Sequence, residues 1–399
     1  MNIVLCVTGS IAAIESIKLA REFKRQGTDV KCFMSDDACK IIHPNTMEFA
    51  TGQKVVTELT GEIEHVKYSQ ADLILVAPAT ANVISKFTCK IADNPINSLL
   101  ITAHGYNTPI LFVPSMHNSM YKSIAFNIES MKKEGINFVN PRLEENKAKF
   151  PKNEDIILES LRAIGKNKHL NNKNIGKNKQ LNNKKVLISL GGTYESIDPI
   201  RGITNKSSGK MGLALAKEAF IRGADLKLIA GKIDVNLPKS FDTIFTESSK
   251  EMNDKTKELV SEYDILIATA AVSDFAPIEK KNSKISSSFD LSLKFKPTEK
   301  IIKQIKDINP EIFLVGFKAE HNISDEDMIK LAKEQIKTSG TDLVVANDVS
   351  KKGCGFGSDN NEVILVNDEI LKINISSKKE IAIAIFDKIS ESINNINLV

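Results

Sequence analysis

The sequence predicts an α/β protein built from two doubly wound, Rossmann-like domains that a flexible linker joins. Three observations support this prediction. Short apolar runs alternate with helical stretches in both halves, a duplicated polar segment separates the halves, and polar motifs follow several apolar runs. Buried strands that alternate with helices indicate a parallel sheet. A chain of 399 residues also exceeds what one hydrophobic core usually supports.

The first half, residues 1–164, contains the alternation expected of a parallel sheet. Helical periodicity covers residues 14–26 and 120–134. Apolar runs of strand length occur at residues 3–7, 30–34, 73–77, 110–113 and 136–139. We expect a flavodoxin-like domain that binds ligands at the carboxyl ends of its strands.

The second half, residues 186–399, repeats this alternation and then ends differently. Its strand-length runs are residues 186–190, 225–230, 265–268, 313–317 and 343–346. Two further runs flank Asn367-Asp368-Glu369, which predicts a hairpin. A final helix is expected near residues 379–393, after a second doubly wound domain.

Residues 165–185 are predicted to form the linker. An 11-residue segment at 164–174 recurs almost unchanged at 175–185, and its lysine, asparagine and glycine residues cannot build a core. A nucleic-acid-binding tail is the alternative. The segment has no aromatic residues on which bases could stack, which favours a solvated linker.

Composition limits the possible classes of function. The net charge of +4 is too small to indicate nucleic acid as a partner. The five cysteines show no metal-binding spacing and suit free thiols in a reducing compartment. No apolar run approaches the ~20 residues of a membrane span, and residues 3–7 resemble a strand more than a signal peptide. We therefore expect a cytoplasmic protein with no membrane partner.

The turn Thr8-Gly9-Ser10-Ile11-Ala12-Ala13 predicts a site for one phosphate group. A dinucleotide fingerprint requires three spaced glycines, and this turn has one. Ser10 and the first N–H groups of the next helix can still hold a single phosphate. This pattern indicates a mononucleotide and argues against a nicotinamide dehydrogenase.

The segment at residues 205–212, Asn-Lys-Ser-Ser-Gly-Lys-Met-Gly, precedes a helical run at 213–221. Its small residues leave backbone N–H groups open to an anion, and Lys210 adds a full positive charge. It is not a P-loop, because Met211 follows Lys210. A capped helix in an ordinary α/β domain explains the same residues equally well.

The turn at residues 8–13, together with His65 and residues 76–82 and 114–121, resembles motifs of flavin-dependent cysteine decarboxylases. Nearly the whole chain resembles the bifunctional coenzyme A biosynthesis family, in which phosphopantothenoylcysteine decarboxylase is fused to phosphopantothenate–cysteine ligase. The resemblance implies that His65 moves a proton during decarboxylation. It also implies an FMN site formed by Gly9, Ser10, Ile11, Ala12, Ser35, Thr80, Ala81 and Asn82.

Two features of the first half depart from the family pattern. His117 stands where an asparagine is usual, and we expect its imidazole to donate to the substrate carboxylate. Residues 141–151 lack the cysteine that acts as proton donor in bacterial members, and they resemble the shorter lid of archaeal-type members. Our hypothesis is that Lys147 or Lys149 of this lid lies over the substrate.

The second half resembles the ligase of the same family. Its motifs are Gly191-Gly192-Thr193-Tyr194-Glu195, with Tyr194 in place of an arginine, Asp198-Pro199-Ile200-Arg201, and residues 205–212. The resemblance implies that Asn205 holds an acyl-cytidylate for attack by cysteine. It implies that Lys210 and Arg201 neutralise phosphate or carboxylate oxygens.

A nucleotide site follows from the same resemblance. Lys284 is expected to bind the triphosphate of CTP, and further contacts are expected from Ala270, Ala271, Asp274, Glu299, Lys300, Ile301, Ile302 and Phe317. Gln335 and Ser339 stand where the family has two triphosphate lysines. Lys333 and Lys337 lie two residues away, on a different helical face.

The predicted activity joins 4′-phosphopantothenate to cysteine with CTP and then decarboxylates the product to 4′-phosphopantetheine with FMN. Mg²⁺ or a similar divalent ion is expected with the triphosphate, although no motif identifies its ligands. The alternative is that only the ligase works, with the flavoprotein domain as an inactive assembly scaffold. The resemblance also implies a homo-oligomer with trimeric flavin domains and dimeric ligase domains, hence a dodecamer.

Overall fold

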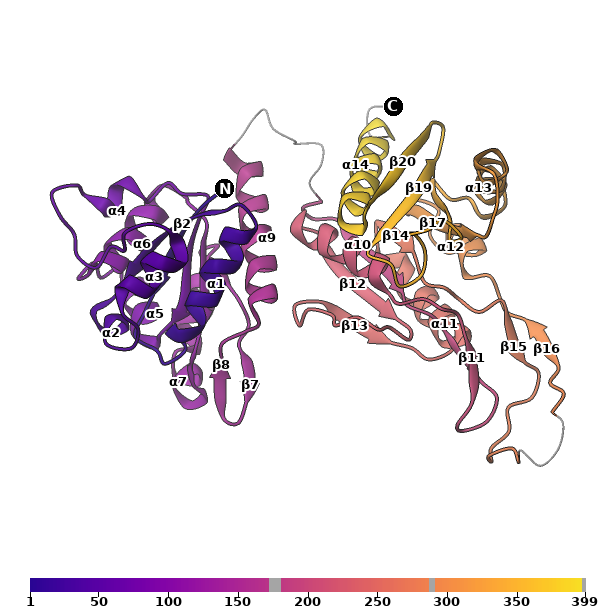
Figure 1. The fold of residues 1–399 in the computed structure, drawn as a ribbon, viewed down its shortest axis with the longest axis horizontal. Helices are drawn as coiled ribbons and strands as arrows, with labels where there is room; N and C mark the ends of the chain where they lie inside the picture. Colours follow the sequence, from indigo (N-terminus) through magenta and orange to yellow (C-terminus); the bar gives the residue numbers. More distant parts are fainter. Residues whose placement is uncertain (172–180, 287–290, 397–399) are drawn as a thin grey trace. The chain divides into compact units, whose positions relative to one another are not determined.

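The computed structural model describes residues 1–171, 181–286 and 291–396. The chain divides into two compact units, Met1–Ile175 and Gly176–Val399 (Figure 1). Each unit is built on a central sheet of its own, and each is described separately below.

The first unit has a five-stranded parallel sheet with the order β2-β1-β3-β4-β6. This is the flavodoxin-like order, and it confirms the predicted fold class. The strands are β1 Asn2–Val7, β2 Asp29–Met34, β3 Leu73–Ala79, β4 Ile110–Pro114 and β6 Asn137–Phe138. A separate small sheet contains β5 Met116–His117, β7 Arg142–Glu144 and β8 Lys147–Lys149.

Helices connect these strands, as the alternation predicted. They are α1 Ala13–Arg25, α2 Asp36–Cys39, α3 Pro44–Thr51, α4 Glu64–Lys67, α5 Ala81–Thr88, α6 Pro95–Gly105, α7 Asn118–Ser123, α8 Ala125–Lys133 and α9 Asn153–Asn171. The one long helix expected at residues 120–134 is divided at Ile124 into α7 and α8.

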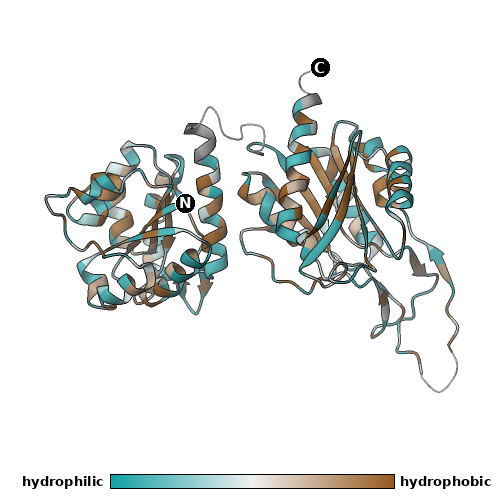
Figure 2. Cartoon of the chain, turned by 45° about the horizontal axis from the view of Figure 1, so that its top comes forward, coloured by the Kyte–Doolittle hydropathy of each residue, from teal (hydrophilic) through white to brown (hydrophobic). Residues whose placement is uncertain are grey.

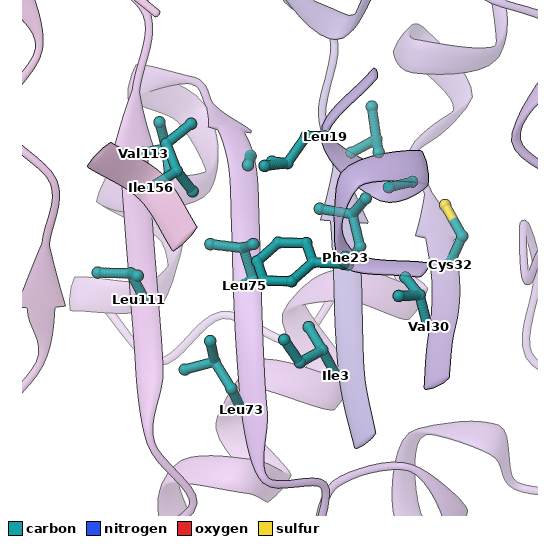
Figure 3. Close-up of a cluster of buried hydrophobic side chains, with 14 of the residues drawn as sticks. Ile3, Leu19, Phe23, Val30, Cys32, Leu73, Leu75, Leu111, Val113 and Ile156 are labelled. Atoms are coloured by element: carbon teal, nitrogen blue, oxygen red, sulfur yellow. The ribbon is translucent and has the colours of Figure 1, made fainter. Parts of the chain in front are cut away.

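The core of the first unit lies on both faces of its sheet. On one face, Phe23 of α1 lies over the strands that carry Ile3 and Leu75, and all three side chains are almost wholly buried (Figure 3). On the other face, Phe87 of α5 packs with Phe112 of β4 at a ring-centroid distance of 5.6 Å. Burial on both faces explains why these strands are apolar throughout.

The second unit has an eight-stranded sheet with the order β13-β12-β9-β14-β17-β18-β19-β20. Its first six strands are parallel and follow the Rossmann order 3-2-1-4-5-6. β19 and β20 form an antiparallel hairpin at the edge, which confirms that prediction. The strands are β9 Lys185–Leu190, β12 Asp225–Ala230, β13 Asp242–Phe245, β14 Ile265–Ala268, β17 Phe313–Glu320, β18 Leu343–Asp348, β19 Asn360–Val366 and β20 Ile370–Ser377.

The remaining elements of the second unit are helices and two small hairpins (Figure 1). The helices are α10 Lys210–Ile221, α11 Ser249–Leu259, η2 Val260–Glu262, η3 Ile301–Lys303, α12 Ile305–Ile308, α13 Asp325–Ser339 and α14 Lys378–Ile396. One hairpin pairs β10 Tyr194–Ser196 with β11 Gly202–Thr204, and the other pairs β15 Phe275–Pro277 with β16 Phe295–Pro297. Figure 2 shows hydrophobic residues concentrated on the central strands.

The ends of the predicted linker belong to folded elements. Helix α9 continues to Asn171, seven residues past the predicted end of the first domain, and Ala163 and Ile164 are buried in the core below it. Leu181 is also buried, and its N–H donates to the carbonyl oxygen of Arg222 at 2.9 Å. Ile164 therefore packs the start of the duplicated segment into the core of the first unit, and Leu181 packs part of its second copy against the second unit. The rest of the predicted linker, residues 172–180, lies outside the described residues.

Among the helices of the described ranges, none combines the length and apolarity that crossing a bilayer requires.

Candidate active sites

In the first unit, three loops meet at the carboxyl ends of β1, β3 and β4. The hydroxyl of Thr8 donates to the carbonyl oxygen of Pro78 at 2.8 Å and accepts the N–H of Thr80 at 3.1 Å. The hydroxyl of Ser10 donates to the carbonyl oxygen of Ser115 at 3.3 Å. The strand order reverses between β1 and β3, so these loops lie at the edge of the sheet where doubly wound folds bind their ligands.

Gly9 lies where the chain has no room for a side chain. A Cβ atom there would stand 2.4 Å from the Cβ of Asp37, so the β1–α1 turn packs directly against α2. Ser35 caps α2 by accepting the N–H of Ala38 at 3.2 Å, and its own N–H donates to the carbonyl oxygen of Val7 at 3.1 Å. The predicted phosphate turn and Ser35 therefore lie at the same end of the sheet.

The helix starts beside these loops suit a phosphate group. No side chain caps α1 at Ala12, but the N–H groups of Ala13 and Glu15 already donate to the carbonyl oxygens of Ser10 and Ala12. This helix start therefore attracts an anion mainly through the positive end of the helix dipole. Thr80 caps α5 by accepting the N–H of Val83 at 3.4 Å. Ile11 is 76% exposed, and Asn82 is also exposed, so both side chains are available to a ligand. These features fit a mononucleotide phosphate.

His65 lies on the short helix α4, which packs against α6. Its Nδ1 atom is buried and has no hydrogen-bond partner in the structure. A buried polar atom normally has a partner, so an unsatisfied imidazole nitrogen fits a group that binds a ligand. Within the described residues, however, no hydrogen bond joins His65 to the loops after β1, β3 and β4.

His117 lies beside the predicted lid. It pairs with Lys147 across the β5–β8 ladder, and Arg142 pairs with Lys149 across β7–β8. The Nδ1 atom of His117 accepts the N–H of Ser119 at 3.3 Å, so in the neutral ring the proton lies on Nε2. An exposed Nε2–H can donate to a carboxylate.

The two lid lysines differ in their surroundings. Lys149 forms ion pairs with Glu145 at 2.8 Å and Glu144 at 3.7 Å. Lys147 is exposed, forms no ion pair within the described residues, and stands directly opposite His117. Of the two lid lysines, Lys147 is therefore the one whose ammonium is not engaged by a carboxylate.

In the second unit, a cavity of about 750 Å³ opens at the carboxyl ends of β9, β14 and β17. β9 and β14 are the neighbours between which the strand order reverses. Most predicted ligase residues line this cavity: Asn205, Lys210, Ala270, Ala271, Asp274, Glu299, Lys300, Ile301, Ile302 and Phe317.

Hydrogen bonds join the two loops that border the cavity. The side-chain amide of Asn205 donates to the carbonyl oxygens of Ala271 at 3.1 Å and Val272 at 3.2 Å. The N–H of Ala271 donates to the carbonyl oxygen of Gly191 at 2.8 Å. Asn205 is thus fixed against the segment that follows β14, beside the predicted nucleotide contacts.

Lys210 is the first residue of α10. The preceding Gly209 has φ = 77°, a left-handed conformation, and provides no side-chain cap. The Lys210 ammonium donates to the carbonyl oxygen of Gly357 and to the carboxylate of Asp359, both at 2.7 Å. This pairing lowers the pKa of Asp359. The cavity therefore has an uncapped helix start and a lysine at the same point.

Charged side chains predicted to contact the nucleotide also line the cavity. Lys300 forms an ion pair with Asp274, although both side chains remain more than half exposed. Glu299 accepts hydrogen bonds from Gln304, Lys257 and Asn253, and these lower its pKa. Across the described residues, six lysines and three carboxylates line the cavity, so its charge is positive.

Two predicted ligase residues lie outside the cavity lining. Arg201 forms an ion pair with Asp198 at 2.9 Å and donates to the carbonyl oxygen of Ile285. Burial would raise the pKa of Asp198, but the N–H donors of Ile200, Ile285 and Arg201 lower it to about 2. Lys284, one residue before Ile285, is exposed. Arg201 therefore anchors the segment that carries Lys284.

The sequence left open which face of helix α13 borders the nucleotide site. Gln335 and Ser339 line the cavity, and Lys333 and Lys337 do not. The helix is not rotated to bring these lysines inward.

Four lining residues near the C-terminus were not predicted from the sequence: Gly355, Phe356, Asn361 and Lys378. The signal available was Gly353-Cys354-Gly355-Phe356-Gly357, a glycine-rich stretch after β18. No cluster of three or more potential metal-ligating side chains occurs in the described ranges.

Comparisons with known proteins agree with this arrangement. A family model described as Flavoprotein matches residues 1–165, and one described as DNA/pantothenate metabolism flavoprotein C-terminal domain matches residues 181–393. A solved structure of the DNA/Pantothenate Metabolism Flavoprotein from Streptococcus pneumoniae is 28% identical, with a TM-score of 0.48, and covers 52% of this chain and 99% of that chain.

Full-length relatives share the name Coenzyme A biosynthesis bifunctional protein CoaBC. The relative from Thermococcus kodakarensis is 45% identical over 402 residues, which cover 98% of this chain and 95% of that protein. The relative from Methanocaldococcus jannaschii is 38% identical and covers 99% and 94%, and that from Bacillus subtilis is 33% identical and covers 98% and 96%. These matches confirm the resemblance seen in the motifs, and the chain belongs to the family of coenzyme A biosynthesis bifunctional proteins.

Proposed function

We propose that the second unit joins 4′-phosphopantothenate to cysteine at the expense of CTP, and that the first unit decarboxylates the product with FMN. The observation that carries the proposal is the positively charged cavity at the β9/β14 switch point. Asn205, Lys210 and most of the residues predicted to contact the nucleotide line this cavity. The relatives named as bifunctional proteins align with both units, and no observation favours the alternative in which only the ligase works.

In the ligase step, the cavity must stabilise negative charge on phosphate and carbonyl oxygens. Lys210 and the open N–H groups at the start of α10 can bind these oxygens. Asn205, fixed against the loop after β14, can orient the activated acyl group. Asp274 and Lys300 are proposed to contact the nucleotide, with a divalent ion that the triphosphate itself coordinates.

In the decarboxylation step, the loops after β1 and β3 are proposed to hold the phosphate of FMN through Ser10, Thr80 and the start of α1. When bound, FMN supplies the oxidation of the thiol-bearing carbon that allows carbon dioxide to leave. The Nε2–H of His117 can orient the substrate carboxylate, and His65 can move a proton.

Purified protein tests both halves of the proposal. It is incubated with 4′-phosphopantothenate, cysteine and each nucleoside triphosphate in turn, and the products are identified by mass spectrometry. We expect pyrophosphate and the amide with CTP, then carbon dioxide and 4′-phosphopantetheine when FMN is bound. Amide without carbon dioxide from FMN-loaded protein would instead support the scaffold alternative.

The proposal also covers the cellular compartment and the oligomeric state of the enzyme. We propose a cytoplasmic enzyme, which the five free cysteines favour. We also propose a homo-oligomer with trimeric and dimeric contacts. Mass photometry of the full chain checks this, with a dodecamer as the expected species.

A further inference from the structure

Lys378 is a buried lysine in the wall of the ligase cavity that the proposed mechanism leaves unused. The residue is 8% exposed, and its ammonium donates to the carbonyl oxygens of Ser358 and, at 3.4 Å, of Gly355. Within the described residues, no carboxylate lies within ion-pair distance of it. Burial, together with the charge of Lys210, lowers its pKa.

A buried ammonium group with only neutral acceptors is costly to the folded protein. Such a charge is normally paired, so this one suits a site whose anion arrives with the ligand. Backbone carbonyls supply only partial negative charge, and the nearest carboxylate, Asp359, is paired with Lys210 and forms no ion pair with Lys378.

One loop holds both Lys210 and Lys378. We name residues 353–359 the glycine loop, because Gly353, Gly355 and Gly357 all have positive φ. Lys210 donates to the Gly357 carbonyl and the Asp359 carboxylate of this loop, and both acceptors of Lys378 also belong to it. The ammonium groups of both lysines therefore donate to this one loop, and both lysines line the cavity.

The position of Lys378 is fixed by helix α14, of which it is the first residue. The hydroxyl of Ser377 accepts the N–H of Glu380 at 3.2 Å, and the Glu380 carboxylate accepts the N–H of Ser377 at 2.9 Å. This reciprocal cap fixes the helix start. The N–H of Lys378 also donates to the carbonyl oxygen of Asp359 at 3.0 Å, so helix and loop are joined at this residue.

The geometry points to Lys378 as a second phosphate-binding residue of the ligase cavity, acting beside Lys210. Two ammonium groups and the uncapped start of α10 together match the several oxygens of one phosphate group. Asp359 is 88% exposed on its side chain, so an incoming phosphate can replace it as the partner of Lys210. The inference rests on the ligase activity proposed above.

The phosphate can come from the acyl substrate or from the nucleotide, and matched ligand pairs distinguish the two sources. Dissociation constants are measured without turnover for 4′-phosphopantothenate against pantothenate, and for CTP against cytidine. In Lys378→Met, we expect the preference for the phosphorylated member of one pair to fall about tenfold to a hundredfold, the loss of one charge-assisted hydrogen bond. Lys378→Arg should retain most of the preference.

Lys379→Met is the matched control, because Lys379 is the next residue, is exposed and lies outside the cavity lining. It should leave both preferences unchanged. A merely structural role for Lys378 would weaken both members of a pair equally, and unchanged preferences in both pairs of Lys378→Met would overturn the inference. Because binding is measured directly, a wild-type protein that binds these ligands but makes no amide would refute the proposed function and leave this test intact.

Discussion

Replacing Gly9 by alanine tests the proposed flavin site most directly. The new Cβ would stand 2.4 Å from the Cβ of Asp37, and ordinary contact begins near 3.4 Å, so the two atoms must separate by about 1 Å. Either the β1–α1 turn or helix α2, which carries its cap Ser35, has to move. Overpacking of this kind costs about 1–3 kcal/mol.

The displaced groups are those proposed to hold the FMN phosphate, so much of this cost should appear as lost affinity. We expect FMN to bind Gly9→Ala about fivefold to a hundredfold more weakly than wild type. The assay is titration of flavin fluorescence with flavin-free protein, together with release of carbon dioxide. Amide formation reports on the second unit and should be unchanged.

Gly105→Ala is the control, because no atom lies within 4 Å of its added Cβ. It should bind FMN as wild type does. If Gly9→Ala also bound FMN with wild-type affinity and unfolded at the wild-type temperature, the β1–α1 turn could not be the phosphate cradle, and the proposed flavin site would be wrong.

Three further predictions follow from the contacts described above. Lys147→Ala should slow decarboxylation about tenfold, and Lys149→Ala should slow it less, because only Lys147 lacks an ion-pair partner within the described residues and lies opposite His117. Equal rates of carbon dioxide release from the two variants would contradict this. Gly212→Ala places a Cβ 2.3 Å from the Leu190 side chain, so α10 must shift and the KM for CTP should rise at least about fivefold with FMN binding unchanged. The pKa of Asp198 is about 2 in the folded protein and ~3.9 for an ordinary aspartate in the unfolded chain. The ionised carboxylate therefore stabilises the fold fully above about pH 4, and this stabilisation is lost as the pH falls toward 2. The urea midpoints of wild type and Asp198→Asn should therefore differ most at pH 6 and converge in acid.

Much of the fold could be predicted from periodicity and from the length of the apolar runs. Strands such as β9 and β14 are buried on both faces, so each is an uninterrupted apolar run in the sequence. The extent of α9 could not be predicted in this way. Ile164 looks like part of the repeated polar segment, and only its burial against the first core explains why the helix continues.

The candidate sites could be predicted where their residues lie close together in the sequence and form a motif. Asn205 and Lys210 precede a predicted helix, and the family resemblance rather than spacing alone assigned them to a site. Lys378 was missed because it reaches the cavity from the far end of the chain, through a loop that gives no periodic signal. Arg201 illustrates the opposite case, in which a motif residue pairs with a buried carboxylate that sequence alone cannot show to be buried.

The positive charge of the ligase cavity comes from several elements of the second unit. Gln335 and Ser339 line the cavity at the positions where the resemblance led us to expect two lysines, and no lysine of helix α13 is among the described lining residues. Lys303, Lys318 and Lys378 line the same cavity from three other elements, so the wall remains positive overall. Lys318 is paired with Glu320 at 2.9 Å, whereas Lys303 and Lys378 have no carboxylate partner in the described part of the chain. Electrostatic attraction of a phosphorylated ligand depends on the summed charge of the wall more than on its exact source, so we expect Lys303 and Lys378 to contribute to it whichever phosphate they contact.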